Sequence, residues 1–215
     1  ALERFVAPLI PAGRVNSLGF VLLKLTAPGV PDLYRGTELW DLSLVDPDNR
    51  RPVDYAARRR LLDELDDWLA TEPDAEARTA WLADHMARPC DDMLKLLVIR
   101  QVLGLRREEP DLFAAGDYQP LAVSGMMDGN AVAYLRWADE RAMIVAVPRL
   151  VSEMLCESRP LRFAKGAWRN TAILLPESLH NRRFRHLYTG EVFQGEEIHL
   201  EELFAHFPAA CLISL

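Results

Sequence analysis

Cysteine is scarce in this chain of 215 residues, which contains three: Cys90, Cys156 and Cys211. They lie far apart, their number is odd, and no C-x-x-C spacing occurs. That pattern argues against a zinc site and against a framework of disulfides. We therefore expect reduced thiols in a cytoplasmic protein.

Long apolar runs and an excess of basic residues are also missing. The longest apolar runs, such as residues 18–25, are interrupted by Gly19 and Lys24 and are too short to span a bilayer. No basic segment followed by an apolar core opens the chain, as it would in a secretory signal. The formal charge is −7, whereas a general nucleic-acid binder carries a basic surplus. We expect neither a membrane nor a nucleic acid as partner.

Motifs for metals, phosphates and nucleophiles are absent as well. The five histidines show no ligand spacing, since His199 and His206 are too far apart for a pair on one helical turn. No glycine-rich phosphate loop is present; Gly125 and Gly129 flank Asp128 in what we interpret as a hairpin turn. No serine or cysteine has a histidine nearby in a known catalytic motif.

The first half of the chain has helical periodicity. Apolar positions 18, 21, 22 and 25 predict a helix that Asn16 or Ser17 caps and Pro28-Gly29 ends. Further helices are predicted over residues 56–69 (capped by Asp54), 74–87 and 91–106. We interpret the basic cluster at 58–60 as a solvated helix face.

The second half of the chain has the pattern of short strands. Strands are predicted at residues 132–137, 143–147, 171–175 and 210–215, with a hairpin over 187–193. This indicates a small antiparallel β-sandwich. Because the composition changes near residue 116, we predict two domains, 1–116 and 117–215.

Residues 30–41 (VPDLYRGTELWD) and 44–54 (LVDPDNRRPVD) concentrate acids, amides, arginines and aromatics among turn-formers. Carbohydrate sites need this mixture, because polar side chains bind sugar hydroxyls and aromatic faces stack on the ring. Residues 30–34 look like a short buried strand that follows the first helix. A helix, a turn, a strand and a polar loop are typical of an α/β barrel, whose active-site loops leave the strand ends.

Residues 24–54 closely resemble the C-terminal part of the maltooligosyl trehalose synthases, a family of the α-amylase superfamily (glycoside hydrolase family 13). Weaker resemblance continues at Lys95 and at residues 103–106, 110–113, 116–118, 168–171, 187–190 and the chain's end. The resemblance implies an α+β fold. It would comprise the terminal helix–strand–loop unit of a (β/α)8 barrel plus helices, followed by the β-sandwich.

The resemblance also implies a reaction. Members of this family convert the reducing-end α-1,4 bond of a maltooligosaccharide into an α,α-1,1 bond, by a retaining mechanism that uses three carboxylates and needs no metal or organic cofactor. Those carboxylates are expected upstream of this chain, which opens on Ala1 as if in mid-protein. We expect the missing N-terminal part as partner and no catalysis by this chain alone. The alternative is a non-catalytic carbohydrate-binding or interaction module.

Arg50 is the main candidate for contact with substrate. The pattern at 50–53 (RRPV) resembles an Arg-x-Pro-Met pattern that follows the last barrel strand in the superfamily, with Val53 in place of methionine. A guanidinium fork there would bind sugar hydroxyls and orient a carboxylate. In the alternative interpretation, Arg50 pairs with Asp46 or Asp48 only to hold the loop.

The other candidates each have a functional and a structural interpretation. Asp46, Asp48 and Asn49 can bind hydroxyls directly or shape the turn at Pro47. Tyr34 and Trp40 can stack on glucose, although for Trp40 we favour the core, and Glu38 can anchor the loop or accept from a hydroxyl. At position 35 the chain has arginine where the family pattern has glutamine.

Overall fold

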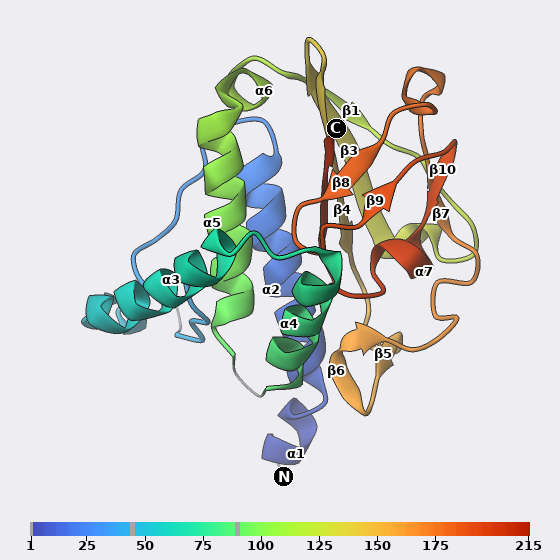
Figure 1. The fold of residues 1–215 in the computed structure, drawn as a ribbon. Coiled ribbons are helices and arrows are strands. Elements are labelled where there is room, and N and C mark those ends of the chain that lie inside the picture. Colours follow the sequence, from blue (N-terminus) through green and yellow to red (C-terminus); the bar gives the residue numbers. More distant parts are fainter. Residues whose placement is uncertain (1, 44–45, 89–90) are drawn as a thin grey trace.

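The computed structural model describes residues 2–43, 46–88 and 91–215 (Figure 1). Pro89, Cys90, and Leu44 and Val45 at the start of the segment 44–54, lie outside the described residues. The α-helices are α1 (Leu2–Val6), α2 (Leu9–Thr26), α3 (Tyr55–Ala70), α4 (Ala75–Ala87), α5 (Met93–Glu108), α6 (Pro110–Ala114) and α7 (Leu200–Leu203). Short 3-10 turns occupy Asp48–Arg50, Asp128–Asn130 and Glu177–Leu179.

The strands pair antiparallel in three sheets. The largest has the order β1 (Asp117–Pro120), β3 (Ala131–Ala138), β4 (Arg141–Pro148), β11 (Ala210–Ser214), β8 (Phe184–His186), β9 (Val192–Phe193). A second sheet has the order β10 (Glu197–His199), β7 (Ala172–Leu174), β2 (Val123–Ser124), and β5 (Leu155–Cys156) pairs with β6 (Arg159–Phe163).

The predicted helices form, and the predicted cap of α3 is confirmed: the Asp54 carboxylate accepts a hydrogen bond from the Ala57 amide at 2.9 Å. Asp74, where we predicted the next helix to begin, caps α4 in the same way. The cap at Asn16 or Ser17 is wrong, because α2 begins at Leu9 and both residues lie inside it. Buried Val15 extends the apolar stripe by one turn, and Pro11 sits in the first turn, where its missing N–H costs little.

The predicted strand at residues 30–34 is also wrong. The segment is extended but pairs with no strand, and Val30 is 97% exposed. A strand needs backbone partners for its N–H and C=O groups. Among the described residues, strands occur only within 117–214 and pair with one another.

The predicted strands of the second half are confirmed in their main features. β3 and β4 form a hairpin in which Asp139, at the turn, takes a left-handed φ of 48°. The hairpin predicted at 187–193 exists as β8 and β9, with residues 187–189 forming the turn instead of strand. The last strand, β11, lies between β4 and β8. The sheets fit a β-sandwich, and the fold is α+β.

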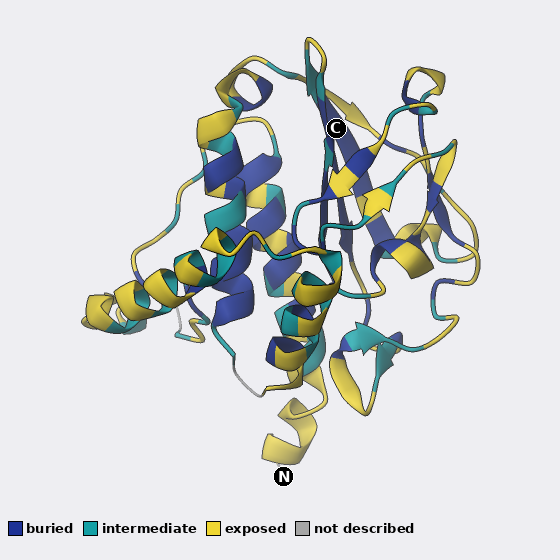
Figure 2. Ribbon diagram, viewed as in Figure 1, coloured by how far each residue is buried: buried dark blue, intermediate teal, exposed yellow. Residues whose placement is uncertain are grey.

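The helices and the large sheet share one apolar core (Figure 2). α2 packs against both α5 and β4, and a Cβ added at Gly19 of α2 would lie 3.4 Å from the Val147 Cβ. Leu22, Leu97 and Ile144 are all buried in the same cluster. The division at residue 116 stays a prediction. No helix among the described residues has the length and apolarity to cross a membrane.

Candidate functional site: the loop between α2 and α3

The loop over residues 27–54 is anchored to the start of α5. The buried Lys95 ammonium donates to the Leu39 carbonyl at 3.0 Å. The Trp40 amide donates to the Asp92 carboxylate at 2.9 Å, and the Trp40 indole N–H donates to the Asp91 carbonyl at 2.5 Å. The Trp40 ring packs partly buried against the core, which fits the interpretation of Trp40 as a core residue.

Two cationic side chains also lie close to the Trp40 ring. The ammonium of Lys95 and the guanidinium of Arg14 lie 5.8 and 5.9 Å from the Trp40 ring centroid, in the range of cation–π attraction. Burial lowers the pKa of Lys95, and the nearby Lys24 lowers it further. The backbone carbonyl of Leu39 and the indole face therefore stabilise a cation that burial disfavours.

A buried pair lies behind this anchor. The His85 Nδ1 lies 2.8 Å from Asp91 Oδ2, and the imidazole packs against Trp81 in a tilted arrangement with 3.8 Å between ring centroids. Trp81 in turn stacks on Trp68 at 4.4 Å. Through Asp91, the ends of α3 and α4 thus fix the residue that receives the Trp40 indole. Sequence reasoning missed these anchors; the signals were a lysine in an apolar helical stripe and two adjacent aspartates before it.

Glu38 holds the loop to the start of α3. Its carboxylate accepts from Arg58 Nε at 3.1 Å, while the same guanidinium donates to the carbonyls of Gly36 at 2.5 Å and Asp54 at 3.0 Å. These contacts match the interpretation of Glu38 as a loop anchor. The interpretation of residues 58–60 as a solvated face is wrong for Arg58, which is partly buried, and holds for the exposed Arg59 and Arg60.

Three candidates, Asp48, Asn49 and Arg50, form the 3-10 turn before α3, and the fourth, Asp46, lies just before it. Arg50 Nη2 donates to Asp46 Oδ2 at 2.9 Å, and its Nε pairs with the other carboxylate oxygen. Arg51 pairs with Asp48 in a second surface ion pair, and Asn49 between them is partly buried. The Arg50 side chain is 69% exposed. The ion pair between Arg50 and Asp46 is one of the two contacts named in the alternative interpretation, in which Arg50 only holds the loop.

Tyr34 lies on the earlier limb of the loop, before the turn at residues 35–38. The residue is 44% exposed, and its carbonyl accepts from the Thr37 amide at 3.0 Å and the Thr37 hydroxyl at 2.7 Å. Gly36 permits the turn, because its φ is +92° and an added Cβ would lie 3.1 Å from Val53. The aromatic face of Tyr34 is therefore accessible on a locally fixed turn.

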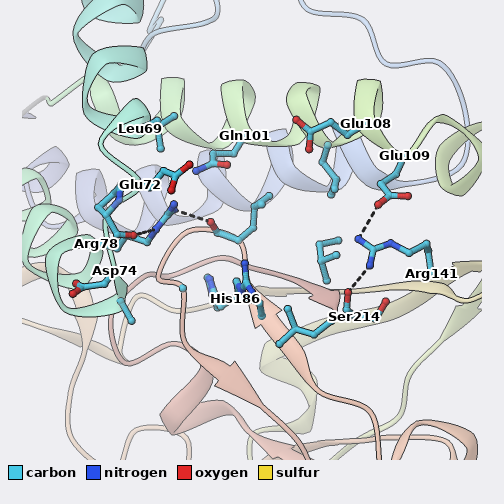
Figure 3. A pocket seen from close by; sticks show the side chains of 18 residues that line it. Leu69, Glu72, Asp74, Arg78, Gln101, Glu108, Glu109, Arg141, His186 and Ser214 are labelled. Carbon is cyan, nitrogen blue, oxygen red and sulfur yellow. Dashed lines mark hydrogen bonds and ion pairs between the residues drawn. The ribbon is translucent and has the colours of Figure 1, made fainter.

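A separate cavity of about 850 Å³ lies between the helices and the end of the large sheet (Figure 3). None of the predicted site residues lines it. Arg141 crosses one end, donating to the Ser214 carbonyl at 2.8 Å and pairing with Glu109 at 2.7 Å. At the other end, Arg78 donates to the carbonyls of Pro73 at 2.8 Å and Leu187 at 3.4 Å.

Buried His186 also lines this cavity. Its Nδ1 accepts from the amides of Tyr188 at 3.2 Å and Thr189 at 3.3 Å, which requires the unprotonated nitrogen. Burial, and secondarily His206, lowers the pKa of His186 to about 3. His186 is therefore neutral at physiological pH.

Comparison with known proteins gives a consistent result. No family model matches the chain. Proteins of two Mycobacterium tuberculosis strains, which carry the inferred name maltooligosyl trehalose synthase, are 34% identical over 99% of this chain and 22% of their own length. Maltooligosyltrehalose synthase from Arthrobacter ramosus is 37% identical, with a TM-score of 0.75 over 100% of this chain and 24% of its own.

A less similar solved structure shares the fold. An α-amylase from Anoxybacillus is 16% identical, with a TM-score of 0.57 over 94% of this chain and 32% of its own. The chain spans about a fifth of the length of the curated relatives it matches. Over its whole length, it is similar to the C-terminal portion of the maltooligosyl trehalose synthases.

Proposed function

We propose that this chain is the C-terminal portion of an enzyme that forms maltooligosyl trehalose. The reaction converts the reducing-end α-1,4 bond of a maltooligosaccharide into an α,α-1,1 bond, an intramolecular transglucosylation of the isomerase class. The observation that carries the proposal is 37% identity with a TM-score of 0.75 to the Arthrobacter ramosus enzyme over the full chain. The alternative of a stand-alone binding module is not favoured, since the matched relatives are enzymes.

The catalytic carboxylates belong, in this proposal, to the rest of the enzyme. A retaining transglycosylation needs a carboxylate nucleophile and a carboxylic acid/base about 5 Å apart, and no metal or organic cofactor. The chain would supply one wall of the substrate site and would have no activity alone. We further propose that the enzyme acts in the cytoplasm, as the sparse, unpatterned cysteines led us to expect.

The loop over residues 27–54 would form that wall. Asp46 takes Nε and Nη2 of Arg50, which fixes the guanidinium plane and leaves the other amino group to donate to sugar hydroxyls. Asp48 and Asn49 on the same turn would accept from hydroxyls, and Tyr34 would stack on a glucose ring. Glu38 would contribute a further acceptor from its place beside Arg58.

The loop and α2 would belong to the end of a (β/α)8 barrel, with residues 1–116 as barrel end and helices and 117–215 as the β-sandwich domain. Exposed apolar side chains support this assignment. Val30 is 97% exposed and Leu42 is 93% exposed, and Phe20 projects from α2 into solvent. Neighbouring barrel elements would cover such apolar surface.

A chimera tests the proposal. This chain would replace the equivalent region of the Arthrobacter ramosus enzyme, and conversion of maltopentaose to a non-reducing product would be measured. We expect activity, and a tenfold to hundredfold lower kcat/KM for Arg50→Gln, because a charge-assisted hydrogen bond contributes about 1.5–3 kcal/mol. The matched control is Arg59→Gln, which removes an exposed arginine of α3. Full activity of the Arg50→Gln chimera would contradict the role of Arg50.

A further inference from the structure

Two arginines that line the cavity of Figure 3, Arg78 and Arg185, pair with no carboxylate in the described part of the chain. Arg78 is half-buried and uses its guanidinium on backbone carbonyls, and Arg185 projects from β8 into the same cavity lining. Among the described residues, neither forms an ion pair with a carboxylate. Burial lowers the pKa of Arg78, and the charge of Arg185 lowers it further. An anion bound between the two guanidinium groups would offset both the burial of Arg78 and its repulsion from Arg185.

Four acidic side chains line the cavity, Glu72, Asp74, Glu108 and Glu109, and two of them are already engaged. Glu109 pairs with Arg141 at the far end, and Asp74 caps α4 through the Ala77 amide. Because Asp74 already occupies the helix terminus, Arg78 and Arg185 are the groups at this end that are suited to binding an anion.

Polar groups suited to hydroxyls lie beside the arginine pair. Figure 3 shows Glu72 and Gln101 next to Arg78 at one end of the cavity, so a carboxylate and an amide face the same space. A carboxylate accepts hydrogen bonds, and an amide both donates and accepts. The two arginines are therefore bordered by groups that bind hydroxyls, Glu72 and Gln101. The Glu72 carboxylate would also repel a ligand that carries many negative charges.

We propose that this cavity binds a phosphate ester of a sugar or small polyol. The phosphate would lie between Arg78 and Arg185, since guanidinium forks bind phosphate oxygens through paired hydrogen bonds. The hydroxyls would meet Glu72 and Gln101. The volume of about 850 Å³ falls in the range of small-molecule sites. The two carbonyls that hold Arg78 reduce the ordering that binding requires.

Calorimetric titration of the 215-residue chain with glucose 6-phosphate, inorganic phosphate and glucose tests this site. We expect glucose 6-phosphate to bind more tightly than inorganic phosphate, and glucose not to bind. Arg185→Gln should weaken glucose 6-phosphate at least tenfold, and this exposed side chain can be replaced without disturbing the fold. Gln101→Ala should weaken glucose 6-phosphate but leave inorganic phosphate unchanged.

Arg183→Gln is the matched control, because Arg183 is exposed just before β8 and does not line the cavity. It should change affinity less than twofold. Equal losses in the Arg183 and Arg185 variants would reduce the effect to general surface charge and overturn the site. Binding of glucose as tight as that of glucose 6-phosphate would overturn the role of the arginine pair. Neither outcome bears on the loop that carries the proposed function.

Discussion

Arg136 should be the side chain whose loss most directly uncouples the helices from the sheet. It lies on β3, is 1% exposed, and donates to the Thr26 carbonyl at 3.2 Å. It also donates to the carbonyls of Phe113 and Gly116, each at 3.1 Å. These acceptors lie at the end of α2 and around α6. Its guanidinium thus holds two helix ends against one strand.

The expected magnitude follows from these contacts. Arg136→Met fills similar volume but leaves three carbonyls without their donor, at about 1.5 kcal/mol each. Removing a buried charge that has no carboxylate partner offsets part of this loss. We therefore expect the free energy of unfolding to fall by about 3 kcal/mol.

Urea denaturation followed by far-UV circular dichroism measures this change. The wild-type chain should unfold in one transition, because helices and sheet share one core. Arg59→Met, at an exposed position of α3, should change stability by less than about 0.5 kcal/mol. A loss below about 1 kcal/mol for Arg136→Met would refute the argument that these bonds join the two halves.

Three further changes test other parts of the fold. The pKa of His186 is about 3 in the folded state and near 6.5 in the unfolded state, so only the unfolded state gains this proton as the pH falls from about 6.5 to about 3. The free energy of unfolding should therefore fall by about 2 kcal/mol from pH 7 to 5. His186→Asn, which retains an acceptor, should lose that dependence, and an unchanged pH profile in this variant would contradict the role of His186. Gly125→Ala should destabilise by at least about 2 kcal/mol, since its φ is +130° and a Cβ would lie 2.7 Å from the Thr171 Cα, whereas Gly129→Ala, with open space, should change little; equal denaturation midpoints would refute the clash. Asp54→Ala should cost about 1 kcal/mol through loss of the α3 cap, and an unaltered midpoint would show that the cap is dispensable.

Features that depend on neighbouring residues were predictable from the sequence. Asp54 and Asp74 each cap a helix within one turn, and the β3–β4 hairpin closes over two turn-forming residues. Helical spacing of the apolar residues predicted the helix over 91–106, which forms as α5 (Met93–Glu108). These elements required no knowledge of distant contacts.

Features that depend on distant partners were not predictable. Residues 30–34 include the strand-formers Val30 and Tyr34, but the described strands pair elsewhere and none of them pairs with this segment. Arg58 lies in a basic cluster, yet Glu38 and the Gly36 carbonyl, some twenty positions earlier, draw its side chain inward. A charge pattern on one helix does not show what a loop places against it.

In the candidate site, too, contacts between neighbouring residues were predictable and contacts with distant partners were not. The 3-10 turn at 48–50 and the Arg50–Asp46 pair span four positions, so the sequence could suggest them as one of two interpretations. The anchors at Asp91, Asp92 and Lys95 lie more than fifty positions from Trp40 and Leu39, and the structure was needed to find them.

The most direct test of the central claim compares this chain alone with the chimera that carries it, using maltopentaose as substrate. The loss of reducing ends at constant total glucose would be measured for both at equal molar concentration. We expect no turnover by the chain alone and formation of a non-reducing product by the chimera. Robust turnover by the isolated chain, or a folded chimera that forms no such product, would contradict this expectation.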